Sequence, residues 1–352
     1  MKFLRGIELE NKLGFDELSD NVVSKRICAR CGGCVVVCPL NALEYENEEP
    51  RLVGKCTNCG LCVRVCPRYQ SPYAEMEEFV FGRPRNADQE LGIYQRALVA
   101  RSTDDEILRK AQDGGVVSTL LVSALESGLI DAAIVSGVDP KNRWLPVPTF
   151  AKTREEIIAC AGTRYSLSPG LPLLKSGINS GLGKMAFVGT PCQILAIRRM
   201  QKSLPKYAKS IALTVGLFCS ENFSCQGLIF DKIQKELGID LNDVVKMNIK
   251  GKFLIYLKDG GVREIPLKEA KKFTMPPCQH CGDFSAELAD ISCGGVGLEG
   301  WTYTLIRTDR GANVFDDAAK KSMLKVEPAK NFELPTKILT KLSKGKRSRL
   351  SP

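Results

Sequence analysis

The chain has 352 residues, of which 44% are hydrophobic, and it has a formal net charge of +10. It contains no run of about 20 apolar residues and begins without the apolar core of a signal peptide, so we expect a cytoplasmic protein without a transmembrane segment. The basic residues are dispersed and only 7% of the chain is aromatic, which argues against nucleic-acid binding. In a reducing compartment, 15 cysteines indicate metal binding rather than disulfides.

The first 85 residues contain two copies of one cysteine pattern, C-x2-C-x2-C-x3-C-P, and the second copy begins 28 residues after the first. With this spacing, three cysteines of one loop bind one cubane cluster while the fourth binds the other cluster. The prediction is therefore one 4Fe-4S cluster on Cys28, Cys31, Cys34 and Cys66, and a second on Cys56, Cys59, Cys62 and Cys38. Zinc is the weaker alternative, because it would use four ligands in pairs. Residues 22 to about 70 resemble bacterial-type ferredoxins, which implies electron transfer.

Residues 68–92 are polar and contain prolines without a clear period, which is typical of a linker. From residue 93 onward, strand patterns alternate with helix patterns, which favours parallel strands covered by helices. The predicted strands are 94–102, 130–138, 184–190 and 211–219, the predicted helices are 104–112, 116–129, 191–204 and 227–238, and an antiparallel hairpin is predicted at 252–266. The predicted fold class is α/β, with a ferredoxin-like domain (1–85), a larger domain with a mixed sheet (86–335) and a basic tail (336–352).

Four cysteines of the larger domain form a candidate third site. Cys192 and Cys219 follow buried apolar strands, where ligands bind in α/β sheets, and Cys278 and Cys281 form a C-x2-C pair. Four thiolates are what a third 4Fe-4S cluster needs. The alternative is a nucleophilic Cys192 at a helix start, but the only histidine, His280, lies inside the C-x2-C pair. The remaining cysteines, read as ordinary buried residues, are Cys160, Cys225 and Cys293.

A site for a dinucleotide cofactor would need a glycine-rich stretch of backbone. The stretches "GLGKMA" (181–186) and "GVGLEG" (295–300) each precede a strand rather than a helix, which argues against a Rossmann NAD site. "AQDGGVVSTLL" fits a pyrophosphate seat better, although Asp113 could simply cap the helix. The predicted cofactor-binding residues are Gly114, Gly115, Ser118, Thr163, Arg164, Tyr165, Ser166, Gly189, Thr190, Gly294 and Gly295.

These motifs together with "VGTPCQILAIR", "GLFCSENF", "CQHCGDFSAELADISCGGVG" and "GWTYTLIRT" resemble the beta-subunit family of coenzyme F420 hydrogenases and dehydrogenases, from residue 93 to about 309. The resemblance implies an FAD that exchanges hydride with F420, an adjacent cluster on Cys192, Cys219, Cys278 and Cys281, and a place in archaeal methanogenesis. The candidates for attracting the anionic F420 are Arg164, Lys184, Arg198 and Arg199.

The additional N-terminal cysteine repeat is similar to the electron-input subunit of F420-oxidising respiratory dehydrogenases. That similarity implies a protein partner linked to a membrane quinone or phenazine, with the chain peripheral at the cytoplasmic face. Partners such as hydrogenase, formate dehydrogenase, heterodisulfide reductase or glutamate synthase remain open, as does a flavin-free electron-transfer subunit. The tail "KILTKLSKGKRSRLSP" could be a disordered solubilising end or could dock onto an acidic partner or an anionic membrane.

Overall fold

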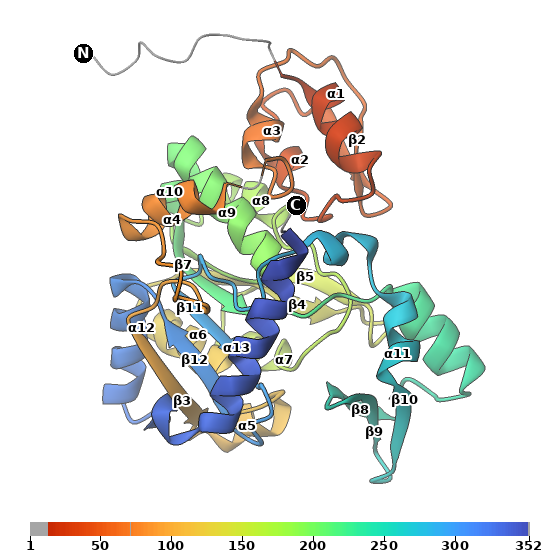
Figure 1. The fold of residues 1–352 in the computed structure, drawn as a ribbon, viewed down its shortest axis with the longest axis vertical. Helices are drawn as coiled ribbons and strands as arrows, with labels where there is room; N and C mark the ends of the chain where they lie inside the picture. The colour runs from red at the N-terminus through yellow and green to blue at the C-terminus, as the bar shows by residue number, and fades with distance from the viewer. Residues whose placement is uncertain (1–12, 71, 351–352) are drawn as a thin grey trace.

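The computed structural model describes residues 13–70 and 72–350. An N-terminal domain (residues 13–70) lies at one end of a larger body built around an eight-stranded sheet, and a three-stranded sheet forms a separate lobe of that body (Figure 1). The last long helix runs along the body toward the N-terminal domain, where the described chain ends (Figure 1).

The two cysteine loops of the N-terminal domain have the same backbone course. Each loop passes through a residue with positive φ, Arg30 or Asn58, and then through a left-handed glycine, Gly32 (φ 76°) or Gly60 (φ 74°), before a short helix. The left-handed region favours glycine because it has no Cβ. The elements of this domain are α1 (Phe15–Leu18), a π-helical turn (Ser19–Val23), α2 (Gly33–Val37), β1 (Leu43–Glu46), β2 (Glu49–Leu52) and α3 (Leu61–Val65).

The large sheet is mixed, as predicted. Its strands are β3 (Arg96–Ser102), β4 (Ala132–Val138), β5 (Pro146–Ala151), β6 (Met185–Gly189), β7 (Ile211–Leu217), β11 (Ile291–Gly294), β12 (Thr302–Ile306) and β13 (Leu324–Pro328). They are arranged in the order β13-β3-β12-β11-β7-β6-β4-β5. The strands β11, β7, β6 and β4 run parallel, and the outer strands pair antiparallel. The carboxyl ends of the parallel strands therefore meet at one edge, which is where ligands bind in such sheets.

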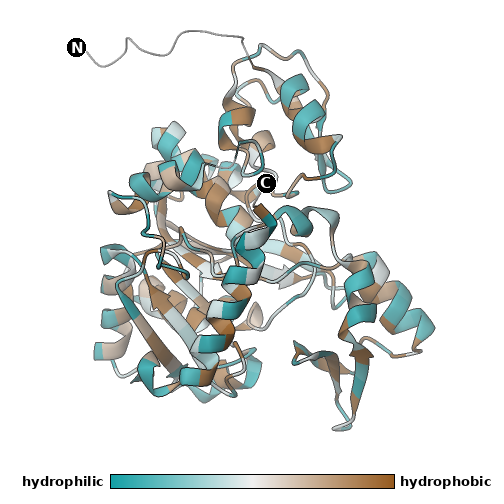
Figure 2. Cartoon of the chain, in the orientation of Figure 1, coloured by the Kyte–Doolittle hydropathy of each residue, from teal (hydrophilic) through white to brown (hydrophobic). Residues whose placement is uncertain are grey.

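Helices cover both faces of the sheet, and each face has its own apolar core. The helices on one face are α5 (Asp105–Lys110), α6 (Val116–Glu126), α7 (Arg154–Ala159) and α12 (Asp309–Lys320), and those on the other face are α8 (Leu173–Asn179), α9 (Pro191–Ser203) and α10 (Pro205–Ser210). The core under α9 also includes Val36, Val37 and Val65 of the N-terminal domain. Apolar residues follow the strands, and polar residues follow the outer helix faces (Figure 2). The N-terminal domain is thus packed on α9 through a shared core.

The three-stranded lobe was not foreseen as a separate unit. Its elements are the π-helix Cys225–Glu236, β8 (Val244–Ile249), β9 (Lys252–Leu257), β10 (Val262–Pro266), α11 (Leu267–Ala270), and two 3-10 turns, Lys271–Phe273 and Pro276–His280. The predicted hairpin is confirmed, because β9 and β10 pair antiparallel across the turn at 258–261. The lobe has its own core, which includes Phe223, Ile233 and Phe253.

Two segments differ from the prediction. The predicted linker contains a helix, α4 (Tyr73–Phe81), which buries Met76 and Glu77. The predicted tail is largely the helix α13 (Glu333–Arg347), which begins after a short turn at Ala329–Asn331 and is followed by another at Ser348–Leu350. The reading of this tail as a disordered end is therefore wrong over its described residues, because α13 buries Leu339, Ser343 and Lys346.

Candidate functional site

The twelve cysteines predicted as ligands gather into three groups of four, and all 15 cysteines, each within the described residues, are free thiols. The first quartet is Cys28, Cys31, Cys34 and Cys66. After burial, Cys28 and Cys66 are among the causes that raise the pKa values of both Cys31 and Cys34, and the pKa of Cys28 rises to about 11 through burial and then through Cys66. This set contains three cysteines of one loop and the fourth cysteine of the other loop.

The second quartet is Cys38, Cys56, Cys59 and Cys62. All four line one apolar pocket of the N-terminal domain, together with Leu40 and Leu52. Backbone N–H groups donate to two of these sulfurs, from Ala42 to Cys38 Sγ (3.3 Å) and from Asn58 to Cys56 Sγ (3.4 Å). Such N–H to sulfur contacts are among the factors that tune cluster potentials. The residues present fit a 4Fe-4S cluster.

The third quartet is Cys192, Cys219, Cys278 and Cys281, drawn from three separate loops. Cys192 lies in the first turn of α9, where Thr190 Oγ1 is 3.4 Å from its Sγ, and Cys219 follows β7. The pKa of Cys219 is raised mainly by burial and then by the other three thiols, and Asn222 N–H donates to Cys278 Sγ at 3.3 Å. Cys281 is buried and the other three thiols are partly buried, so the residues present fit a thiolate-bound cluster.

The three quartets follow one another through the molecule. Cys192 of the third quartet raises the pKa of Cys31 in the first quartet, after burial and two nearer thiols, and Cys62 of the second quartet does the same to Cys34. The order is therefore third, first, second. Cys59, in the second quartet, is exposed. The series begins inside the large domain and ends at the surface of the N-terminal domain.

Cationic side chains surround the third quartet. Burial alone would raise the pKa of Cys281, but Lys346 and Arg68 together hold it below its ordinary value. Arg68 donates to the carbonyls of His280 (2.6 Å) and Pro277 (3.2 Å). Lys346 donates to the carbonyl of Cys219 at 2.5 Å. Sequence reasoning missed both cations, because each is distant in sequence from the cysteines that it approaches.

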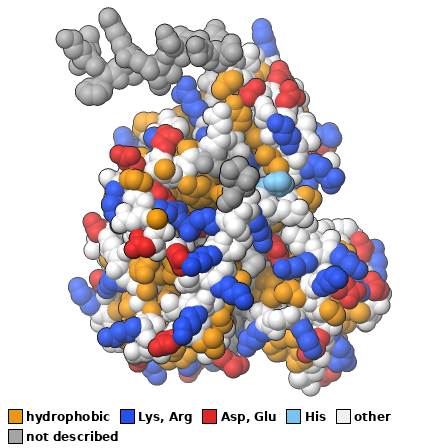
Figure 3. All heavy atoms as spheres, in the orientation of Figure 1, with side chains coloured by type: hydrophobic (Ala, Val, Ile, Leu, Met, Phe, Trp, Pro, Cys, Tyr) orange, Lys and Arg blue, Asp and Glu red, His pale blue; other side chains and the backbone are white. Residues whose placement is uncertain are grey.

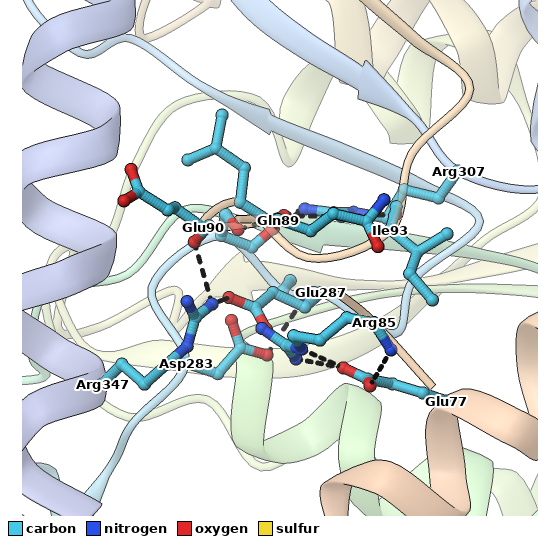
Figure 4. Close-up of polar contacts among 12 residues, drawn as sticks. Glu77, Arg85, Gln89, Glu90, Ile93, Asp283, Glu287, Arg307 and Arg347 are labelled. Atoms are coloured by element: carbon cyan, nitrogen blue, oxygen red, sulfur yellow. Dashed lines mark hydrogen bonds and ion pairs between the residues drawn. The ribbon is translucent and has the colours of Figure 1, made fainter. Parts of the chain in front are cut away.

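A largely buried ionic network follows Cys281 along the chain, centred on Glu287 (Figure 4). Glu287 forms ion pairs with Arg85 from the former linker and with Arg347 from α13, and Arg85 also pairs with Glu77 of α4. The backbone N–H of Glu287 donates to Asp283 Oδ2 at 2.9 Å. The segment from Cys278 to Glu287 is thus bonded both to Arg85, which precedes it in the chain, and to Arg347, which follows it.

The predicted cofactor loops also converge, but they are tightly packed. A Cβ on Gly295 would clash with the carboxyl group of Asp113, and one on Gly114 would lie 2.6 Å from a backbone oxygen of β3. Gly115 (φ 72°) precedes α6 without any side-chain cap, so the alternative of Asp113 as its N-cap is wrong. The N–H of Gly114 donates to Thr302 Oγ1 at 3.0 Å. The glycines thus meet protein atoms, and the fit to a pyrophosphate is less complete than the fit of the thiols to clusters.

The other predicted cofactor residues belong to several different elements. Tyr165 packs edge-on against Phe253 of the lobe, and Ser166 bridges to Phe223. Thr190 forms a capping box with Gln193 at the start of α9. The remaining predicted residues are placed as follows: Thr163 beside Arg164 is partly buried, Ser118 is buried in α6, Gly189 ends β6, and Gly294 contacts Phe218.

Three of the arginines proposed to attract F420 are used internally, which corrects that expectation. Arg164 donates to the carbonyls of Cys160, Ala161 and Gly162. Arg198 pairs with Asp290 at 3.0 Å, and Arg199 donates to carbonyls that follow α3. Basic and acidic side chains alternate over the face seen in Figure 3, without one dominant basic patch. The arginines are therefore structural, and of the four candidates only Lys184 remains exposed.

The three cysteines read as ordinary residues lie outside the quartets. Cys160 ends α7, Cys225 lies 3.9 Å from the carbonyl of Trp144, and Cys293 is within 3.9 Å of Thr304 Oγ1. The pKa of Cys293 is raised to about 12 by burial. In the described part of the chain, no group of three or more His, Cys, Asp or Glu side chains is set to hold a single metal ion. Within residues 13–70 and 72–350, none of the helices is long and apolar enough to cross a membrane.

Comparisons with known proteins agree with this arrangement. Residues 182–331 match the family described as the C terminus of the coenzyme F420 hydrogenase/dehydrogenase beta subunit, and residues 97–175 match the N-terminal part of the same beta subunit. Residues 20–77 match a 4Fe-4S dicluster domain. The three matches follow the division into an N-terminal domain and a larger body.

Two relatives and one solved structure are also subunits of F420 hydrogenases or dehydrogenases. The beta subunit of the coenzyme F420 hydrogenase of Methanosarcina barkeri is 42% identical over 268 residues, covering 74% of this chain and 90% of the relative. The F subunit of the F420H2 dehydrogenase of Methanosarcina mazei is 31% identical over 333 residues, covering 92% of this chain and 91% of the relative. A chain of the solved F420-reducing [NiFe] hydrogenase complex from Methanosarcina barkeri is 40% identical, with a TM-score of 0.72 over 76% of this chain and 93% of that chain.

Proposed function

The chain belongs to the coenzyme F420 hydrogenase/dehydrogenase beta-subunit family and has an N-terminal 4Fe-4S dicluster domain, and from this premise we propose that it oxidises reduced F420 and delivers single electrons to a partner complex. As a member of this family it is an electron-transfer oxidoreductase. The proposal adds FAD as the hydride acceptor, the third quartet as ligands of a third cluster, and the division into domains at about residues 85 and 335.

The observation that supports a path for electrons through the chain is the order of the quartets. The third quartet lies beside the cofactor loops, since Cys192 contacts Thr190, and the second quartet reaches the surface at Cys59. FAD, when bound, would take two electrons as hydride and release them one at a time. The chain's own task is to hold the two rings in contact and to exclude water from them.

A partner linked to a membrane quinone or phenazine is the favoured acceptor. The F420H2 dehydrogenase relative matches 92% of this chain, whereas the hydrogenase relative matches 74% and leaves about a quarter unmatched. The alternatives are the same chemistry in a hydrogenase, formate dehydrogenase, heterodisulfide reductase or glutamate synthase complex. The chain would then act at the cytoplasmic face of the membrane or in the cytoplasm.

The function is tested by an anaerobic absorbance assay with the full chain, FAD, reduced F420 and an artificial one-electron acceptor. We expect oxidation of F420 that depends on added FAD. Turnover with NADH but not with reduced F420 would overturn the proposal. No oxidation of reduced F420 and no bound FAD, with the clusters intact, would instead support a flavin-free electron-transfer subunit.

The third cluster is tested separately by substitution. Cys192→Ala should lower the iron content after anaerobic reconstitution from about twelve to about eight atoms per chain, because one cubane contains four irons. The matched control is Cys160→Ala, which removes a cysteine outside the quartets and should leave the iron content unchanged. Equal iron contents in the two variants would contradict the assignment of the third quartet.

A further inference from the structure

Lys346 is a buried lysine in the last turn of α13, with 3% of its surface exposed. Its Nζ donates to the carbonyl of Cys219 at 2.5 Å. Lys346 interacts electrostatically with all four cysteines of the third quartet. One lysine therefore faces the whole quartet.

No carboxylate within the described residues lies at ion-pair distance from Lys346. A buried cation without a compensating negative charge costs several kcal/mol. The thiolates of the third quartet are the groups positioned to provide that charge.

Arg68 approaches the same quartet from the N-terminal domain, whereas Lys346 belongs to α13. It follows α3 in the N-terminal domain and is bonded to the backbone on both sides of Cys278, through Pro277 and His280. The thiols that raise its pKa most, against the opposing effect of burial, are Cys281 and Cys192. Two cations from distant segments thus flank the third quartet.

We propose that Lys346 and Arg68 raise the reduction potential of the cluster bound by the third quartet, an inference that rests on the proposed function. Reduction adds one electron, and hence one negative charge, to the iron-sulfur core without breaking a ligand bond. Fixed positive charges in a low-dielectric interior stabilise that added charge. The electron comes from the hydride-accepting site and leaves toward the first quartet. Both side chains are positioning residues, since they act through the cluster rather than on F420.

The experiment is a redox titration of the reconstituted full-length protein, followed by electron paramagnetic resonance. The reduction step that disappears in Cys192→Ala identifies the third cluster. In Lys346→Gln and in Arg68→Gln, this step should move to lower potential by at least about 59 mV, a tenfold loss in the equilibrium constant of reduction. Lys346→Arg, which keeps the charge, should restore most of the potential.

The matched control is Lys341→Gln, an exposed lysine of the same helix, which should leave the potential unchanged. The steps of the other two clusters serve as internal controls in every variant. If either Gln variant binds the full iron content and titrates like the wild type, the inference is wrong. Should Lys346→Gln bind too little iron, Arg68→Gln decides alone. A wild type with only eight irons would instead contradict the proposed function, so the two failures are distinguishable.

Discussion

Asp113 lies in the loop that precedes α6. Its carboxyl group is close to Gly295, which follows β11. Burial raises the pKa of its carboxyl group to about 6, although Lys246 and Lys250 oppose the rise. A folded-state pKa above the ordinary value means that the folded protein binds this proton more tightly than the unfolded chain does. Ionisation of Asp113 therefore lowers stability as the pH rises from about 4 through about 6.

Asp113→Asn should remove this penalty. At about pH 7.5, where Asp113 is ionised, we expect the variant to be more stable than the wild type by on the order of 1–2 kcal/mol, and the gain should shrink at about pH 5. The measurement is the free energy of chemical unfolding at both pH values. A gain of the same size at both would show that the carboxyl group titrates normally.

At the scale of elements, the sequence predicted most of the buried strands and the amphipathic helices of the larger domain. Two strands that it did not predict, β5 and β13, contain Pro146, Pro148 and Pro328 and lie at the two edges of the sheet. An edge strand bonds to one neighbour only and so tolerates proline, which otherwise argues against a strand. Local composition is therefore a poor guide to strands that contain proline, because their position at the edge of the sheet decides whether proline is tolerated.

The missed helices have a similar cause. α4 buries Glu77, whose charge is compensated by Arg85 across a turn, and α13 buries Lys346. Neither residue reads as a core position without its partners. The cysteine repeat of the N-terminal domain could be recognised because its spacing is local, whereas Arg68 and Lys346 reach the third quartet only through tertiary packing. The sequence therefore suggested the cysteine quartets but not the charges around them.

The docking of α13 depends on few apolar side chains. Leu339 is completely buried, whereas Leu342, one turn later, is 39% exposed. Leu339→Ala should lower the free energy of unfolding by about 2–4 kcal/mol, because a buried leucine leaves a cavity. The control, Leu342→Ala, should cost less than about 1 kcal/mol. Chemical unfolding measures both, and equal losses would mean that α13 does not pack as described.

At the scale of the whole molecule, Arg199 joins the two domains. It extends from α9 and donates to the carbonyls of Arg64, Cys66 (2.6 Å) and Tyr69 (2.8 Å) at the end of α3. Together with the shared core beneath α9, these bonds fix the first quartet next to the third. The distance between these two cysteine quartets thus depends on a residue that belongs to neither of them.

Arg199→Gln should loosen this junction at a cost of about 2–3 kcal/mol, since it removes several charge-assisted hydrogen bonds. We expect faster cleavage between residues 66 and 95 in limited proteolysis, with the larger body intact. Arg64→Gln is the control, because its side chain is exposed and only its carbonyl accepts from Arg199. Identical cleavage rates in the two variants would show that Arg199 does not hold the domains together.

The segment from Pro276 to Glu287 is bonded to Arg68 and Arg85, which precede it in the chain, and to Arg347 and Arg349, which follow it. During synthesis, the arginines that precede the segment are made before it. The arginines that follow it are made only after the rest of the body. The N-terminal cluster sites can be assembled early on the nascent chain. The third quartet gains its contact with Lys346 only when α13 is released, so the surroundings of these cysteines are completed last.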